Sequence, residues 1–179
     1  MLESKNFFLR PLQAPEDVTS RYLGWLRDSD ITRHLEVDGP SQTVETLTDY
    51  VKQHDNKNRF LFGIFSEDGV HIGTHSFRMQ EKHKLATVGV MIGEKEYWGK
   101  GVPLETRACI LDWAFDELGC NKVEAGCFST NLPAIYNFIK QKWTKEGIQR
   151  SHRIINDQRV DSILYGMLRE KWDAIRNRK

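Results

Sequence analysis

The sequence predicts an α/β domain built on a mixed, mostly antiparallel sheet, with one parallel strand–helix–strand unit. Three observations predict this fold class. The 179 residues and the 39% apolar content fit one packed domain, since a domain usually has roughly 100–200 residues. Apolar residues follow the pattern of strands between residues 60 and 92. The most regular helical segment then lies between two strand-like segments, an order in which the two strands are usually parallel.

The first half of the chain predicts one strand, two helices and a three-stranded meander. Pro11 ends the first strand, and the hydroxyl of Ser41 can cap the second helix. Asp68-Gly69 is a hairpin signal between two apolar runs. The expected elements are a strand at 7–9, helices at 16–26 and 41–54, and strands at 60–65, 71–77 and 86–92.

The second half predicts two helices, a strand and a C-terminal hairpin. Apolar residues recur at helical steps between Leu104 and Leu118, and Gly119 stands where a helix C-cap belongs. The expected elements are helices at 104–118 and 132–141, and strands at 122–128, 147–155 and 160–168. We therefore expect a single domain over residues 1–168 and a basic, solvated tail over residues 169–179.

Charge balance and apolar patterning exclude several classes of protein. The 26 Lys+Arg against 25 Asp+Glu give a formal charge of +1, without the basic field of nucleic-acid or anionic-membrane binders. Gly63 interrupts the longest apolar run, whereas a membrane span needs about 20 apolar residues. The chain start lacks a signal-peptide pattern, and the cysteines (Cys109, Cys120 and Cys127) are typical of reduced thiols. We expect a cytoplasmic protein without nucleic-acid or membrane partners, and the sequence leaves a homodimer open.

The sharpest motif is the segment Tyr97–Pro103, at the start of the most regular helix. Gly99 and Gly101 let the backbone curl and approach a ligand closely. Pro103 suits the first turn of a helix, whose free amides attract anions, and Lys100 adds a positive charge. A phosphate or pyrophosphate is the expected ligand. The spacing fits neither a P-loop nor a dinucleotide fingerprint, and a plain strand–helix turn stays the alternative.

Further motifs lie on both sides of this glycine loop and cover nearly the whole chain. They are Tyr22-Leu23-x-Trp25-Leu26, Ile92-Gly93, Trp113-Ala114-Phe115, Leu118-Gly119, Asn131, Ile135, Lys140 and Glu146-Gly147. Together with Tyr97-Trp98-Gly99-Lys100-Gly101 they resemble the acetyl-CoA-binding core of the GNAT superfamily of N-acetyltransferases. The branch that they resemble most is that of the ribosomal-protein N-terminal acetyltransferases. The predicted order of helices and strands matches that fold.

The resemblance implies direct transfer of an acetyl group from acetyl-CoA to an amine, with no metal. In the family, the strand that ends at Ile92 is splayed from the strand at 122–128. The resemblance implies that main-chain groups of Val90, Met91 and Ile92 pair with the pantetheine arm and that Asn131 bonds the pantetheine region. It also implies a pyrophosphate site made by the amides of the loop: Trp98, Gly99, Lys100, Gly101, Val102 and Pro103.

The residues that would move protons are less defined. Many members of the family carry a tyrosine in the second helix that protonates the leaving thiolate, and the matching residue here is Phe138, expected beside the cofactor. Tyr136, two residues away, is the candidate acid, with solvent or Ser129 as alternatives. His75 lies beside the expected catalytic strand and is the candidate base, with a half-buried polar residue as the alternative interpretation.

Metal and thiol chemistry are not expected. His71 and His75 share a face of an ideal strand, but no motif supplies the remaining ligands that zinc needs. Cys109 and Cys127 have no histidine near them in the sequence, so small buried hydrophobic residues are the better interpretation.

The acceptor side is predicted from charged residues at two places. His34 and Glu36 follow the first helix, where the family usually builds its acceptor site, with a solvated loop as the alternative. The C-terminal hairpin carries Arg150, Arg153 and Arg159, which suit phosphate binding. We therefore predict a small amine acceptor on an anionic carrier, a nucleotide-linked amino sugar. A protein N-terminus, a polyamine or a drug stays open, as does a non-catalytic acyl-CoA-binding sensor.

Overall fold

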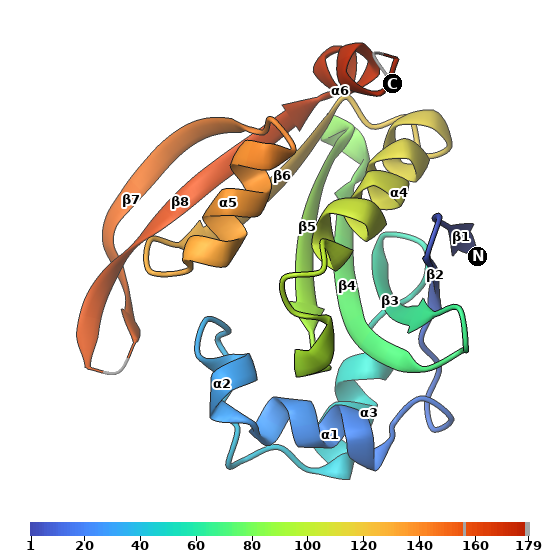
Figure 1. Cartoon of the computed structure of the whole chain (residues 1–179), viewed down its shortest axis with the longest axis vertical. Coiled ribbons are helices and arrows are strands. Elements are labelled where there is room, and N and C mark those ends of the chain that lie inside the picture. The colour runs from blue at the N-terminus through green and yellow to red at the C-terminus, as the bar shows by residue number, and fades with distance from the viewer. Residues whose placement is uncertain (156, 178–179) are drawn as a thin grey trace.

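The computed structural model describes residues 1–155 and 157–177 and contains one sheet in the order β1-β2-β3-β4-β5-β6-β8-β7 (Figure 1). The strands are β1 (Leu2–Glu3), β2 (Phe7–Pro11), β3 (Arg59–Ser66), β4 (His71–Gln80), β5 (Leu85–Ile92), β6 (Lys122–Phe128), β7 (Thr144–Ile155) and β8 (Gln158–Leu168). The helices are α1 (Ser20–Arg27), α2 (Ser29–Thr32), α3 (Val44–Lys52), α4 (Val102–Asp116), α5 (Leu132–Lys140) and α6 (Arg169–Arg176). No helix within the described ranges is long and apolar enough to span a membrane.

The pairing of the strands confirms the predicted mixed sheet. Every pair of neighbouring strands is antiparallel except β5 and β6, which are parallel and are connected through α4. The parallel register is short, and its last pair is Thr87 with Glu124. Beyond Thr87, β6 pairs only with β8, and Figure 1 shows β5 and β6 diverging. A gap therefore opens in the sheet beside the second half of β5.

Helices cover both faces of the sheet. In β3, Phe60 and Phe62 enter one core while Leu61, between them, enters the other, as the alternation of a strand requires. The first core contains side chains of α4, α5 and α6, including Phe115, and the second contains side chains of α1 and α3, including Tyr22. The gap between β5 and β6 therefore has α4 and α5 on one side of the sheet and α1 on the other.

Local capping shifts two helix boundaries from those predicted. The Thr19 hydroxyl accepts a hydrogen bond from the Tyr22 N–H, so α1 begins at Ser20 rather than at residue 16. Thr43, and not Ser41, caps α3, because Thr43 and Thr46 form a reciprocal capping box. The short elements β1 and α2 leave no periodic signal in the sequence.

The C-terminal segment corrects the prediction of a solvated tail. Residues 169–176 form α6, and Trp172 is only 3% exposed. The Trp172 indole N–H donates to the Asp112 carboxylate of α4 at 2.7 Å, and Arg176 forms ion pairs with Asp112 and Asp116. Helix α6 is therefore packed against α4 as part of the domain.

Candidate active site

The main chain of β5 presents hydrogen-bonding groups to the gap. The Gly93 N–H donates to the Ile72 carbonyl of β4 at 2.9 Å. Because successive residues of a strand direct these groups to opposite sides, the main chain of Met91 faces β4, whereas Val90 and Ile92 face the gap. Three residues were predicted to pair with a pantetheine arm. The main-chain groups of Met91 face β4 inside the sheet, so only Val90 and Ile92 direct such groups to the gap.

Trp98 contributes to this region through its side chain. Its indole N–H donates to the Ile92 carbonyl at 3.0 Å, which fixes the end of β5. Its own amide donates to the Lys95 carbonyl at 3.0 Å. The groups that stay available along the gap are the N–H and C=O of Val90 and the N–H of Ile92.

The loop before α4 has the geometry of an anion site. Gly99 and Gly101 have φ values of 75° and 78°, in the left-handed region that favours glycine. A Cβ at either position would meet no atom within 4 Å, so the space in front of the loop is open. Within the described residues, the N–H groups of Gly99, Gly101 and Val102 have no hydrogen-bond partner. These three donors, at the positive end of α4, suit a pyrophosphate.

Two of the other predicted donors differ from expectation. The Lys100 N–H donates to the Tyr97 carbonyl at 3.4 Å, and the Lys100 Nζ lies 5.4 Å from the centroid of the Tyr97 ring. Pro103 has no N–H to donate, and its role is to start α4. Lys100 thus offers its charge rather than its amide.

The N-terminal motif and the end of β5 meet at one point. A Cβ on Gly93 would lie 1.9 Å from the ring of Trp25, so only glycine allows this indole to pack there. The Trp25 Nε1 also donates to the Glu94 carboxylate at 3.1 Å. The two motifs therefore hold α1 against the open end of the gap.

Asn131 lies on the other side of the gap, at the start of α5. Its Oδ1 accepts a hydrogen bond from the Ala134 N–H at 3.1 Å and so caps the helix. The cap leaves the Asn131 side-chain NH2 without a partner among the described residues, so the predicted pantetheine contact stays a prediction.

The predicted acceptor residues come together from distant parts of the chain. Glu36, in the loop after α2, forms an ion pair with Arg153 of β7. His34 lies in the same loop, and burial lowers its pKa, with the charge of Arg33 acting in the same direction. In Figure 1 the β7–β8 hairpin extends beyond the rest of the sheet. The pair therefore joins this hairpin to the helical layer around α2.

The arginines of the hairpin are largely engaged within the protein. Arg153 pairs with Glu36 and also contacts the ring of His152. Arg159 donates to the Ser151 carbonyl at 3.1 Å. Arg150 is exposed. A phosphate would have to compete with these existing partners.

The structure has a hollow of about 470 Å³ between α1, α2 and the segment after β5. Carboxylates and two cations line it together with the Trp25 ring. The charged residues are Arg21, Asp28, Glu94, Lys95 and Glu96. Lys95 bridges Asp28 and Asp30, each at 2.8 Å, and Arg21 pairs with Glu94 at 2.9 Å. The hollow is adjacent to the end of β5 and carries a surplus of negative charge.

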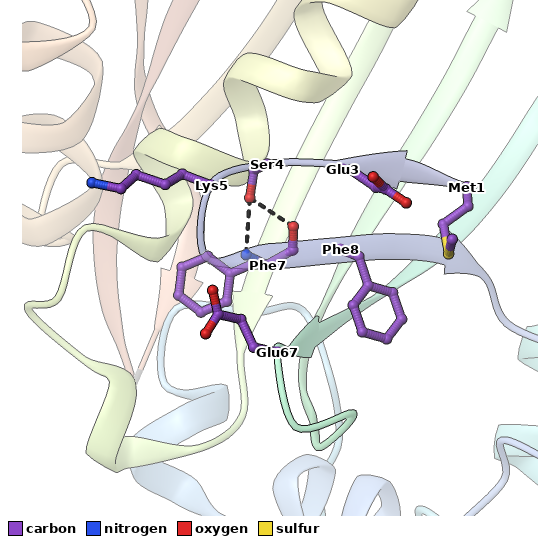
Figure 2. Close-up of a pocket in the computed structure, with 7 residues that line it drawn as sticks. All are labelled: Met1, Glu3, Ser4, Lys5, Phe7, Phe8 and Glu67. Carbon is purple, nitrogen blue, oxygen red and sulfur yellow. Dashed lines mark hydrogen bonds between the residues drawn. The ribbon is translucent and has the colours of Figure 1, made fainter.

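A second hollow, of about 300 Å³, lies at the N-terminal hairpin (Figure 2). Figure 2 shows the Ser4 hydroxyl within hydrogen-bonding reach of the Phe7 main chain, so its polar group is already used. No residue of the predicted site lines this hollow.

Comparison with known proteins agrees with this geometry. A sequence model described as an acetyltransferase (GNAT) domain matches residues 6–136. The chain belongs to the GNAT family of acetyltransferases. With the gap and the anion loop, this membership makes the protein an acetyl-CoA-dependent N-acetyltransferase.

Relatives of this acetyltransferase carry similar names. It is 25% identical to an uncharacterized N-acetyltransferase p20 of Bacillus licheniformis, with 96% of this chain and 97% of the relative covered. It is 28% identical to the probable N-acetyltransferase YjcK of Bacillus subtilis, with 92% and 97% covered.

Two solved structures illustrate the range of acceptors within this fold. The spermidine N-acetyltransferase of Vibrio cholerae, in complex with CoA and spermine, has a TM-score of 0.84 at 18% identity, with 93% and 97% covered. A ribosomal-protein-S5-alanine acetyltransferase of Vibrio fischeri has a TM-score of 0.80 at 20% identity, with 95% and 97% covered. At these identities the likeness concerns the fold alone.

The environment of His75 in this acetyltransferase argues against the predicted role as a base. The ring has no exposed surface and lies between the Gly89 carbonyl, at 3.1 Å, and the Thr106 hydroxyl, at 2.9 Å. Burial, and then the charge of Arg107, lower the pKa of His75 to about 3. Such a ring stays neutral and has no path to an acceptor.

His71 and His75 do not share a face of the sheet, contrary to the ideal-strand expectation. A register shift between Ile64 and Phe65 of β3 marks an irregularity opposite this part of β4. His71 therefore packs against Tyr22 on the α1 side, while His75 contacts Thr106 of α4. No group of metal-binding side chains is found in the part of the chain that the structure describes.

The two aromatic candidates on α5 lie on opposite sides of the helix. Tyr136 is 61% exposed. Phe138 is 4% exposed, and its ring stacks on Tyr165 with centroids 4.3 Å apart and lies against Trp143. Phe138 is therefore a core residue in this structure, and its predicted contact with the cofactor stays a prediction.

Cys109 and Cys127 are half-buried rather than fully buried as expected, and Cys120 is buried. Burial raises the pKa of Cys109 and of Cys127 to about 11, so neither is a ready nucleophile. The residue that sequence reasoning missed is Arg107, a buried cation on α4, because a charged residue inside a helical pattern is usually solvated.

Proposed function

We propose that this enzyme acetylates the primary amine of a small, cationic acceptor. Acetyl-CoA supplies the acetyl group in activated form, as a thioester. The single observation that carries the donor half is that the Val90 and Ile92 main-chain groups face a gap that ends at an open glycine loop. An extended pantetheine arm can continue the sheet there, where β6 has left it.

The chain's own groups hold and polarise the donor in this proposal. The N–H groups of Gly99, Gly101 and Val102 bind the pyrophosphate, and the charge of Lys100 assists them. A main-chain N–H of β5 holds the thioester carbonyl oxygen, which gains negative charge as the amine attacks. A preorganised donor of this type contributes roughly 3–4 kcal/mol to the rate.

The proposal needs no buried side-chain base. The acceptor amine loses its proton to water before it attacks, since His75 has no exposed surface. Tyr136 is exposed on the far side of α5 from Phe138, so it is not assigned as the acid in this proposal.

Charge around the acceptor side supports a cationic substrate. Three carboxylates and two cations line the 470 Å³ hollow: Asp28 pairs with Lys95 and Glu94 with Arg21, whereas Glu96 forms no ion pair among the described residues. Glu36, in the loop after α2, pairs with Arg153. The hairpin arginines, on which a nucleotide-linked amino sugar would depend, already donate to protein groups at Arg153 and Arg159.

A panel of amines tests the acceptor class. Thiol release from acetyl-CoA is measured with spermidine, with a nucleotide-linked amino sugar and with a peptide that begins with alanine. We expect the highest kcat/KM with spermidine. Preference for the sugar nucleotide would instead assign the acceptor site to the arginines, and preference for the peptide would assign a protein N-terminus. Binding of acetyl-CoA without turnover of any amine would favour the acyl-CoA sensor.

A further inference from the structure

A buried histidine connects strand β5 to the first turn of α4. The Nδ1 of His75 lies 3.1 Å from the carbonyl oxygen of Gly89 in β5, and its Nε2 lies 2.9 Å from the hydroxyl of Thr106 in α4. That hydroxyl lies 2.8 Å from the carbonyl oxygen of Val102, the first residue of α4. One ring therefore reaches both the strand that borders the gap and the helix that follows the anion loop.

The contacts of this ring and of the hydroxyl compete for protons. Carbonyl oxygens only accept, so the contact at Gly89 needs a proton on Nδ1, and the contact at Val102 needs the proton of the Thr106 hydroxyl. The contact between the ring and the hydroxyl would then need a further proton on Nε2. Burial lowers the pKa of His75 to about 3, so at neutral pH the ring is neutral and carries a proton on only one nitrogen.

The form with the proton on Nδ1 leaves no polar atom of the two side chains without a partner. In this form the Nδ1–H donates to the Gly89 carbonyl and the Thr106 hydroxyl donates to Nε2, while the Val102 carbonyl keeps its helical hydrogen bond from the Thr106 N–H. In the other form the bare Nδ1 would face the Gly89 carbonyl oxygen, acceptor against acceptor, in the core. The Nδ1–H form is therefore the more stable one.

The Gly89 carbonyl belongs to the peptide unit that also contains the Val90 N–H. Gly89 pairs with Ser76, so its carbonyl faces β4, and the Val90 N–H on the opposite side of the same plane faces the gap. A second donor on the carbonyl oxygen holds this plane in place. It also makes the N–H a stronger donor, because hydrogen bonds at the two ends of a peptide unit polarise each other.

This peptide unit lies where β5 has the least other support. The last parallel pair of β5 with β6 is Thr87 with Glu124, so the strand has lost its neighbour on the gap side before Gly89. Gly89 has no side chain to restrict its backbone. A Cβ there would lie 2.8 Å from the Ser76 hydroxyl, which favours glycine at this position. The contact from His75 therefore holds a part of the strand that is otherwise free on one side.

We propose that His75 is a positioning residue of the donor site: its Nδ1–H holds the Gly89–Val90 peptide so that the Val90 N–H donates to acetyl-CoA in the gap. The inference rests on the proposed function, in which acetyl-CoA lies along Val90 and Ile92. His75 touches no part of the ligand, in agreement with its lack of exposed surface. Its effect reaches the ligand through one peptide plane.

The first test is the tautomer of His75 in the wild type. It is read by NMR from the ring nitrogen shifts of isotope-labelled histidine, assigned through bonds to the His75 main chain, with and without CoA. We expect a protonated Nδ1 and a bare Nε2 in both states. A proton on Nε2 in the complex would overturn the inference, and this readout needs no variant.

Two variants separate positioning from packing. In His75→Asn the amide nitrogen is bonded to Cγ, as Nδ1 is in histidine, so a donor to the Gly89 carbonyl is kept. In His75→Gln the amide nitrogen is one bond farther out, so this donor is lost. We expect kcat/KM for acetyl-CoA to fall by about 10-fold in His75→Gln and to stay within about 3-fold of the wild type in His75→Asn, since a weakened donor costs less than a deleted one. His83→Gln, at an exposed histidine, is the control.

Stability gives the contrast that a packing role would not. Both variants remove the buried ring, so urea unfolding should show both to be less stable than the wild type, while only His75→Gln loses activity. Equal losses of kcat/KM in the two variants, or an unchanged kcat/KM in a folded His75→Gln, would overturn the inference. If neither variant folds, the tautomer of the wild type decides. A wild type that does not bind acetyl-CoA in calorimetry would refute the donor site itself, whatever the tautomer.

Discussion

The proposed donor half and the proposed acceptor half of the site are built in different ways. The donor half consists of main-chain groups of β5 and of the loop before α4, positioned by the sheet and by two glycines with positive φ. The acceptor half consists of side chains on a loop and on a projecting hairpin, joined by the Glu36–Arg153 pair. The first half is fixed by backbone geometry, whereas the second depends on which side chains the chain carries.

This difference explains why one fold serves several acceptors. In the proposed site, main-chain donors bind the CoA part of the donor, which is the same whatever the acceptor is. Side chains on loops can change without disturbing the sheet. The fold neighbours act accordingly on spermidine and on a ribosomal protein.

The largest expected effect is on the donor half. In Gly101→Glu a side chain with a negative charge enters the space in front of the anion loop, and we expect the affinity for acetyl-CoA to fall by about 10²-fold or more. Gly69→Glu is the matched control, because Gly69 also has a positive φ of 77° and open space at its Cβ. Calorimetry on both variants gives the comparison. Equal affinities in the two variants would refute the assignment of the loop.

The next largest effect is on the free energy of unfolding at acidic pH, through the buried ring of His75. The pKa of His75 is about 3 in the folded protein and about 6.5 in an unfolded chain. Between these values the unfolded chain binds more protons, so the stability that a neutral His75 contributes is lost as the pH falls from 6.5 towards 3. Between pH 7 and pH 5 this costs about 2 kcal/mol.

Urea unfolding at pH 7 and at pH 5 measures this loss in the wild type and in His75→Gln. We expect the free energy of unfolding of the variant to depend less on pH, by about 2 kcal/mol. His71, whose pKa burial lowers to about 4, acts in the same direction and stays in both proteins. An identical pH dependence in the two proteins would mean that His75 is accessible, and would return it to the list of candidate bases.

A smaller effect is expected in the acceptor half. Glu36→Gln should raise the KM for a cationic acceptor by about 5–10-fold and leave kcat and acetyl-CoA binding unchanged, the pattern of lost ground-state binding. Glu67→Gln, at the N-terminal hollow, is the control. Steady-state kinetics with spermidine measure both. A lower KM in Glu36→Gln would indicate an anionic acceptor and a site centred on Arg153.

The smallest effect separates capping from binding at Asn131. Asn131→Ala and Thr43→Ala each remove a helix N-cap, so each should lower the free energy of unfolding by about 1 kcal/mol. Only Asn131→Ala should also weaken acetyl-CoA binding, because α3 lies on the other face of the sheet. If calorimetry gives the same acetyl-CoA affinity for both variants, Asn131 is a cap and nothing more.

The sequence predicts the strands and the helix around the proposed donor half well because their signals are local. The β3–β4–β5 meander, the glycine loop and α4 are each encoded by spacing within a few residues, and the parallel pair follows from their order. The Ile92-Gly93 motif and the Tyr22-Leu23-x-Trp25-Leu26 motif occur in the same chain for a packing reason. A Cβ at Gly93 would clash with the ring of Trp25.

The sequence predicts side-chain environments poorly because these depend on distant packing. His75 is mid-strand in the sequence, yet its burial depends on Thr106 of α4. Glu36 and Arg153 are 117 residues apart, and no local pattern connects them. The sequence does not predict the burial of Arg107, because charged residues on a helix usually face water. Here α5 covers the side chain.

The most direct test of the central claim is hydrogen exchange of single amides of β5, measured by NMR with and without CoA. If the pantetheine arm occupies the gap, the amide of Val90 should become protected when CoA binds, while that of Met91, which faces β4, should change little. The alternation between these neighbours is the signature of a ligand that extends the sheet. An unchanged Val90 amide at saturating CoA would contradict the account.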